Sequence, residues 1–302
     1  MAAAGEAGSV SPRNMTRTRR LLPRWLILLP CLGFVLATAS AWGWSTVENW
    51  ADVLLLQMKA KQPLPALSAY GASLSLPDAY EVQRLIVREL SAQSPVVGFK
   101  AELTTPLARV KMHGDSAVTS AILKRDLLAP GAEVGPAGPG EHSLSPAIGF
   151  IVKQRIDKPV TDAATLPALI DKAVPVVMVL DQRFENRAAV RAPDLVAANG
   201  AHTHLVVGKP FARPEPTIVD AQFIEVLHDD NVIDRAKATN VLGSQAYALQ
   251  WIINDLVRRK LAIVPGQLLV TGPLAEPMPI SPGTYTVDFW EHERIPLTLT
   301  KP

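Results

Sequence analysis

The sequence is poor in cysteine and in charged residues. Cys31 is the single cysteine among 302 residues, and only 19% of the residues are charged. One cysteine excludes a disulfide framework and a zinc site made of thiolates. The low charged fraction, together with 48% hydrophobic residues, excludes a disordered chain. Without disulfides or a thiolate metal site, a hydrophobic core must hold the fold. The sequence also lacks a G-x-S-x-G elbow and a glycine-rich phosphate loop.

The charge is nearly balanced overall but unevenly placed. The 30 Lys and Arg and 28 Asp and Glu give a formal net charge of +2. Residues 1–24 contain one acid, Glu6, and the arginines Arg13, Arg17, Arg19, Arg20 and Arg24. The rest of the chain is therefore slightly acidic, whereas a nucleic-acid-binding protein needs a basic face to neutralise phosphates. We expect no nucleic-acid partner.

The arginine-rich start leads into the uncharged segment Trp25–Trp44, which is typical of an export signal or a membrane anchor. The small residues Ala39-Ser40-Ala41 fit the cleavage site of a signal peptide, whereas Trp25 and Trp44 bracket the segment as the interfacial aromatics of an anchor would. Both alternatives place the later residues outside the cytoplasm, because the positive flank stays inside. A buried N-terminal helix is the third alternative. We expect residues 1–44 to form this leader, 45–74 a helical linker, and 75–302 the main domain.

Strand patterns dominate the remaining chain. Ser75, followed by Pro77 and Asp78, predicts the start of a helix that ends near Ser91. A second long helix is predicted over 244–260, with Arg258 and Arg259 on its solvent face, and a shorter one over 163–172. Strands are predicted at 96–103, 147–153, 174–180, 204–207, 217–228, 268–271, 283–290 and 295–300, and a loop at 130–140. The pattern indicates one α+β domain, rich in strands, after N-terminal helices.

Several short motifs follow one another between Leu76 and Leu299. They are Asp78-Ala-Tyr-Glu-Val-Gln83, Val96-Val-Gly-Phe-Lys-Ala-Glu-Leu-Thr-Thr-Pro106, Asp181-Gln-Arg183, Asp194-Leu-Val-Ala-Ala-Asn199, Leu242-Gly243 and Leu269-Val-Thr-Gly-Pro-Leu274. In order and spacing they resemble the hydratase/decarboxylase branch of the fumarylacetoacetate hydrolase superfamily, the 2-keto-4-pentenoate hydratases and 4-oxalocrotonate decarboxylases. The resemblance implies a mixed β-sheet or roll of that type.

The resemblance also implies a divalent-cation site, which the sequence does not match. The family holds Mg²⁺ or Mn²⁺ with an E-x-E pair on one strand and a third carboxylate on the next. The corresponding positions here are Ser145, Ala147 and Met178. A hydroxyl, a methyl and a thioether do not suit a hard cation. We therefore expect no metal cofactor, unless Mg²⁺ or Mn²⁺ is bound at a site rebuilt elsewhere, for which His142 is a candidate ligand.

Other family positions retain polar residues. Lys100 corresponds to the family lysine that faces the substrate, and Asp115 to an acid in a loop that closes over the site, so the resemblance makes them the candidate catalytic residues. The alternatives are a solvated lysine and a turn-forming aspartate. Glu102 stands where the family has a glycine. The candidate substrate-binding residues are Leu103, Thr104, Asn199, Thr271 and Gly272.

Two further pairs of polar residues are candidates for functional contacts. Asp181 and Arg183 are expected to form an ion pair or an oligomer contact, with a part in catalysis as the alternative. His202 and His204 could place two imidazoles on one strand face for zinc or copper, with surface histidines as the alternative.

These patterns leave functions of different classes open. The first is an exported or membrane-anchored relative of the hydratases that has lost its metal and binds a small carboxylate or a protein partner. The alternative is a divergent hydratase or decarboxylase, a lyase acting on an unsaturated 2-keto acid through Lys100 and Asp115. A third is a scaffold tethered at the membrane. The resemblance implies a homo-oligomer, and an uncleaved leader would add the membrane as a partner.

Overall fold

The computed structural model describes residues 46–70, 74–135, 142–181, 183–200, 202–290 and 292–300, and Ser45–Pro302 form a single unit. The predicted leader lies outside the described residues. Within them, no helix has the length and apolar character needed to cross a membrane.

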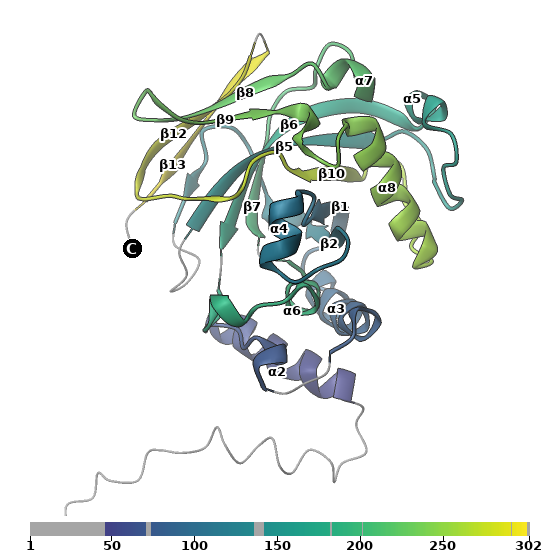
Figure 1. Ribbon diagram of the computed structural model, residues 1–302, viewed down its shortest axis with the longest axis vertical. Coiled ribbons are helices and arrows are strands. Elements are labelled where there is room, and N and C mark those ends of the chain that lie inside the picture. Colours follow the sequence, from purple (N-terminus) through teal and green to yellow (C-terminus); the bar gives the residue numbers. More distant parts are fainter. Residues whose placement is uncertain are drawn as a thin grey trace, which may run out of the picture. The chain divides into compact units, whose positions relative to one another are not determined.

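Three helices pack together at one end of the unit (Figure 1). They are α2 (Thr46–Ala60), α3 (Leu76–Ser91) and α6 (Ala192–Ala197). The Ser75 side chain accepts a hydrogen bond of 3.2 Å from the Asp78 amide, which caps α3 as predicted. Leu54 of α2, Ile86 of α3 and Val196 of α6 belong to one buried apolar cluster. Segment 46–70 therefore packs as part of the same unit as the rest.

The larger of two sheets has eight strands. Its order is β2 (Val118–Leu123), β1 (Val96–Glu102), β10 (Leu268–Pro273), β5 (His142–Val152), β6 (Ile170–Asp181), β7 (His202–Val207) and β3 (Leu127–Leu128), with β11 (Met278–Pro279) also pairing with β5. β1 runs parallel to β10, with Gly98 opposite Leu268. β5 and β6 pair antiparallel over nearly their whole length.

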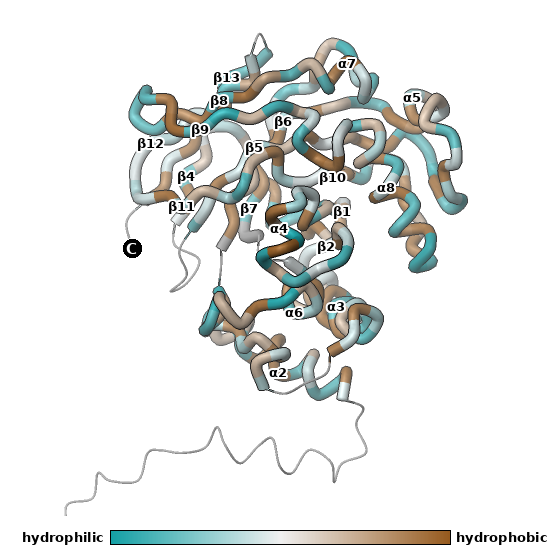
Figure 2. Tube along the Cα trace, viewed as in Figure 1, coloured by the Kyte–Doolittle hydropathy of each residue, from teal (hydrophilic) through white to brown (hydrophobic). Residues whose placement is uncertain are grey.

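The second sheet has five strands and, with helix α8 (Gln245–Arg258), covers the outer face of the first. Its order is β4 (Glu133–Val134), β13 (Glu293–Leu299), β12 (Gly283–Phe289), β8 (Phe223–His228) and β9 (Asn231–Lys237). The main core includes Phe150 of the large sheet, Phe289 of the small sheet and Ile253 of α8. Figure 2 shows hydrophobic and hydrophilic residues alternating along α8, as its predicted amphipathic pattern requires.

The opposite face of the large sheet, here called the inner face, packs against itself. Its buried cluster draws only on strands of this sheet, from Ile122 on β2 to Leu205 on β7. The long strands β5 and β6 curve strongly in Figure 1, so the sheet to which they belong is curled. The α+β roll that the resemblance implied is therefore confirmed.

Several predicted boundaries were wrong. The helix expected over 163–172 ends at Leu169, because β6 starts at Ile170 and pairs with Val152. The strand expected from 217 starts at Phe223, after α7 (Pro216–Val219). The loop expected over 130–140 contains β4, and its residues 136–140 lie outside the described ones. The short helices α4 (Pro106–Lys111) and α5 (Leu166–Leu169) complete the fold.

Candidate functional site

Three predicted positions lie on the inner face of β5 and β6. Ser145 is directly opposite Met178 in the antiparallel ladder, so their side chains share a face. Ala147 lies two residues after Ser145 and therefore on that face too. All three are fully buried, and Ala147 and Met178 belong to the inner-face apolar cluster. The Ser145 hydroxyl donates to the Ala275 carbonyl at 2.9 Å. The structure thus brings together the positions that the motif alignment selects.

Lys100 points to the same inner face from β1. It is opposite Val270 of β10, which in turn is opposite Gly149 of β5, two residues from Ala147. The Lys100 side chain is completely buried and forms an ion pair with Glu102. The alternative of a solvated strand-end lysine is therefore wrong.

The Glu102 carboxylate lies in a small buried site, here called the Glu102 seat, which is formed by Lys100, Ser120 and Gly200. Its Oε1 accepts hydrogen bonds from Lys100 Nζ and, at 2.5 Å, from Ser120 Oγ on the neighbouring strand. Gly200 closes the seat, because a Cβ at its φ of 76° would overlap Glu102 and Ser120. Two donors converge on one carboxylate oxygen, so the ammonium group already has a counter-ion from its own chain.

Burial lowers the pKa of Lys100 below the ordinary lysine value, because a low-dielectric site disfavours the charged form. The negative charges of Glu102 and Asp126 oppose this lowering. The Lys100 ammonium group has no contact with solvent, and Glu102 is its counter-ion.

Two candidate substrate-binding residues meet where β1 and β10 end. Thr104 is buried, and its hydroxyl donates to the Pro273 carbonyl at 3.3 Å. A Cβ on Gly272, whose φ is 119°, would overlap the Thr104 side chain. Leu103, at a positive φ of 56°, packs into the helical cluster. Thr104 and Gly272 are therefore in close contact where the two strands end.

Thr271 and Asn199 are committed to other contacts. The Thr271 hydroxyl lies on the outer face, donates to Gln245 Oε1 at 2.6 Å and is 3.1 Å from the Ile148 carbonyl oxygen. The Asn199 amide accepts from the Ala121 backbone N–H at 2.8 Å and donates to its carbonyl at 3.1 Å. Asn199 thus clamps the end of α6 to β2 and positions Gly200 beside Glu102.

Asp115 lies apart from this buried group. Its side chain is exposed in the turn between α4 and β2. Arg183, Asn199 and His204 line a cleft of about 650 Å³ together with Lys61 and Arg125. The side chains of Asp181 and His202 lie outside the described ones, so the proposed Asp181–Arg183 and His202–His204 pairs stay predictions.

The inner face does not offer a divalent cation the ligands it prefers. Hard cations take several oxygen ligands, chiefly carboxylates, whereas Ser145 uses its hydroxyl on a backbone carbonyl and Ala147 and Met178 supply none. Among the residues that the structure describes, no group of three or more His, Cys, Asp or Glu side chains is arranged to hold a metal ion.

Three residues have contacts that the sequence did not predict: Ser120 and Gly200 in the Glu102 seat, and Arg259 outside it. Ser120 and Gly200 carry no local signal, because each acquires its role from a contact with a distant strand. Arg259 was expected to face solvent, but its guanidinium lies 4.0 Å from the centre of the Tyr80 ring. The sequence did identify Lys100 and the Glu102 substitution.

Solved structures share this fold. A 4-oxalocrotonate decarboxylase from Pseudomonas putida G7, complexed with magnesium and adipate, superposes with a TM-score of 0.77 at 21% identity and covers 84% of this chain and 97% of that one. A yeast fumarylacetoacetate hydrolase family protein superposes with a TM-score of 0.52 at 8% identity, over 67% and 92% of the two chains. The chain has the fumarylacetoacetate hydrolase fold.

Sequence comparison finds relatives among the decarboxylases and hydratases. The chain is 25% identical over 223 residues to 4-oxalocrotonate decarboxylase of Pseudomonas sp. (strain CF600), over 73% of this chain and 83% of the relative. It is also 25% identical over 210 residues to 2-keto-4-pentenoate hydratase 1 of Dechloromonas aromatica (strain RCB), over 68% and 78% of the two chains. No protein-family model matches. The chain is a homologue of the 4-oxalocrotonate decarboxylases and 2-keto-4-pentenoate hydratases.

Proposed function

We propose that this protein is a binding module derived from the hydratase/decarboxylase fold, and that it takes a small carboxylate without a divalent cation. The observation that carries the proposal is the inner face. Ser145, Ala147 and Met178, which the motifs align with the family's metal ligands, are fully buried on one face. Placing a hydrated cation among these side chains would cost the surrounding apolar contacts and return no carboxylate ligand.

The Lys100–Glu102 pair supports the same proposal. A lysine that stabilises a substrate's carboxylate or enolate must have its charge available when the substrate enters. Here Glu102 already takes that charge, and Ser120 completes the contact. Binding of a second carboxylate at Lys100 would require Glu102 to leave a site from which water is excluded.

The ligand class follows from the relatives. The Pseudomonas putida G7 decarboxylase structures contain adipate with magnesium and acetate with calcium. We extend only the carboxylate part of these ligands to this chain. Cationic side chains can bind a carboxylate directly, without a metal ion. Basic residues that line surface hollows are suitable partners, Lys61 and Arg125 in one hollow and Arg258 and Arg259 in another.

The experiment combines metal analysis, an activity assay and titration of the purified full chain. We expect less than stoichiometric Mg²⁺ and Mn²⁺, no ultraviolet change with a 2-hydroxydienoate under metal supplementation, and saturable binding of a carboxylate in calorimetry. One equivalent of metal per chain, or metal-stimulated turnover, would overturn the proposal. Absence of binding for every carboxylate tested would also overturn it.

The lyase alternative requires Lys100 and Asp115 to act together. Lys100 is buried on Glu102, whereas Asp115 is exposed, so a lyase would need both a displaced Glu102 and a closed loop. Its test is direct: turnover of an unsaturated 2-keto acid must occur in the wild type and disappear in Lys100→Ala.

The leader and the oligomer belong to the proposal as well. The arginine-rich start and the uncharged segment Trp25–Trp44 support export or anchoring, with the folded unit outside the cytoplasm. The homo-oligomer is an expectation that rests on the motif resemblance alone. Cell fractionation with an accessibility assay tests the first, and crosslinking that gave only monomers would contradict the second.

A further inference from the structure

A hollow of about 840 Å³ lies outside the roll, between α3, the outer face of β1 and β2, and α8. Its walls include Tyr80, Phe99 and Trp251, all partly exposed, with Val87 and Leu261 beside them. Phe99 and Lys100 are consecutive on β1, so they point to opposite faces of the sheet. The hollow is therefore separate from the inner face and its buried ion pair.

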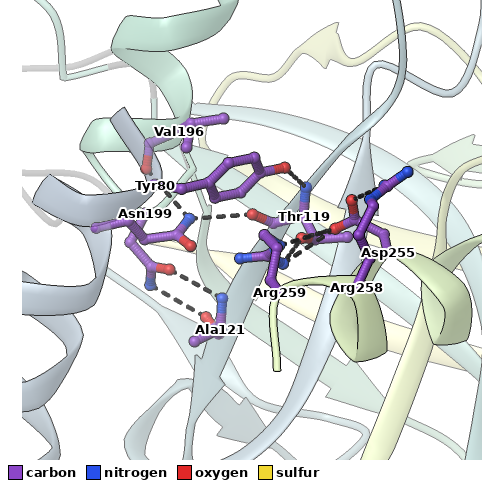
Figure 3. A network of polar contacts seen from close by, with 9 residues as sticks. Tyr80, Thr119, Ala121, Val196, Asn199, Asp255, Arg258 and Arg259 are labelled. Carbon is purple, nitrogen blue, oxygen red and sulfur yellow. Dashed lines mark hydrogen bonds and ion pairs between the residues drawn. The ribbon is translucent and has the colours of Figure 1, made fainter. Parts of the chain in front are cut away.

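One end of the hollow is polar and tightly organised. Figure 3 shows Tyr80, Thr119, Asp255, Arg258 and Arg259 converging there from α3, β2 and the end of α8. The Asp255 carboxylate accepts from Arg258 at 2.6 Å, from Arg259 Nε at 3.1 Å and from the Thr119 hydroxyl at 2.8 Å. Arg259 also donates to the Thr119 hydroxyl and stacks on Tyr80. The Arg259 guanidinium is thus held in one position before any ligand arrives.

This end carries an uncompensated positive charge. Two guanidinium groups share one carboxylate, Asp255, while the nearby Arg84 is neutralised by Glu81. Arg258 is exposed over 71% of its side chain, so it can turn toward an incoming anion without breaking the Arg259–Asp255 contact. A single additional negative charge would complete the balance.

The Tyr80 hydroxyl supplies a neutral donor at the same place. Its oxygen accepts from the Thr119 backbone N–H at 3.1 Å, which leaves its own hydrogen to donate. Burial and the nearby Asp255 raise the pKa of Tyr80, although Arg259 acts in the opposite direction. The phenol therefore keeps its hydrogen at neutral pH.

We propose that this hollow binds a monocarboxylate with an apolar body, whose carboxylate meets Arg258, Arg259 and the Tyr80 hydroxyl and whose hydrocarbon part lies on Phe99 and Trp251. This rests on the proposed function, since it names the ligand class and the place where the carboxylate is taken. The apolar walls favour an alkyl or aryl body over a second charged group. The net single positive charge favours one carboxylate over a dianion.

Octanoate is the probe, with acetate as the anion that lacks the body and 1-octanol as the body that lacks the charge. In calorimetry of the full chain, octanoate should bind at one per chain and more tightly than either. Arg258→Gln and Tyr80→Phe should each weaken octanoate binding by about tenfold, the effect of one hydrogen bond to a charged group. Arg235→Gln is the matched control, because Arg235 is exposed and pairs with Glu225 on the smaller sheet.

The outcomes separate the site from the function. If octanoate binds equally to the wild type and to both hollow variants, or if only acetate binds, this site assignment is wrong while carboxylate binding stands. If no carboxylate binds to the wild type, the proposed function fails as well. A second copy of the chain is the competing occupant. A dimer that dissociates in Arg258→Gln, together with no octanoate binding, would assign the hollow to that copy and overturn the proposal.

Discussion

Lys100 and Glu102, two residues apart on β1, neutralise each other on the buried inner face of the roll. Alternation along a strand brings their side chains to the same side, and the Ser120 hydroxyl holds the carboxylate in place. This pair stands beside the positions that the motifs align with the family's metal ligands, so the inner face contains one internal ion pair within an apolar surrounding.

Glu102→Gln should lower the free energy of unfolding by about 3–5 kcal/mol, because it leaves the Lys100 charge buried without a partner. The double variant Lys100→Met with Glu102→Gln should recover much of that loss. Urea unfolding measures both. Glu89→Gln removes one partner of an exposed pair with Lys59 and should cost at most about 1 kcal/mol. A Glu102→Gln loss no larger than this control would contradict the ion pair.

The stability contributed by Lys100 should depend on pH. Burial lowers its pKa in the folded chain, so between that value and the ordinary lysine pKa of about 10.4 the unfolded chain binds more protons. The penalty for burying the charge is fully present below this window, and the free energy of unfolding should rise with pH across it. Tyr80, whose pKa is raised, acts with the opposite sign.

The measurement that isolates Lys100 is the difference in unfolding free energy between the wild type and Lys100→Met at successive pH values. The wild type should gain on the variant as the pH rises through the window. A difference that stays constant with pH would show that the Lys100 pKa is the same in the folded and unfolded chains.

Met178→Glu tests whether the inner face tolerates a carboxylate at a family ligand position. Met178 is fully buried in the apolar cluster, so the carboxylate should cost several kcal/mol at neutral pH, of the order known for unpaired buried polar groups. The cost should shrink at low pH, where the carboxyl is neutral. Met178→Leu should cost less than about 1.5 kcal/mol. Wild-type stability of Met178→Glu with bound Mg²⁺ would argue for a retained metal site.

Gly200→Ala should destabilise the chain more than Gly243→Ala. Both glycines have a positive φ, 76° and 91°, so each substitution carries a backbone cost of about 1–2 kcal/mol. A Cβ at Gly243 would meet nothing within 4 Å, whereas one at Gly200 would overlap Glu102 and Ser120. The difference in thermal stability between the two variants therefore measures the cost of the steric overlap with Glu102 and Ser120. Equal losses of stability would contradict this close contact.

Local signals predicted the elements that local chemistry determines. Ser75 caps α3 and the amphipathic pattern of α8 is found where expected. Strand β9 was missed, because Asn231–Lys237 has an exposed pattern and takes its strand form from pairing with β8. The helix expected beyond Leu169 was wrong for the same reason, since β5 imposes strand structure on Ile170.

The residues of the site divide in the same way, into those that local sequence patterns identify and those that only tertiary packing brings together. The motif spacing led to Ser145, Ala147 and Met178, and alternation on β1 could have suggested the Lys100–Glu102 contact. The seat also needs Ser120 from β2 and Gly200 from the end of α6, and the hollow needs α3 and α8 side by side. Such arrangements depend on tertiary packing, which single-sequence patterns do not encode.

The parallel pairing of β1 with β10 has a consequence for the order of folding. β1 can pair early with β2, its neighbour in the chain, but Gly98 meets Leu268 only after almost the whole chain has been synthesised. Until then one edge of β1 has unsatisfied backbone donors and acceptors, and such edges invite pairing with other chains. Closing the roll is therefore a late, long-range event, and the nascent chain needs protection of this edge for most of its synthesis.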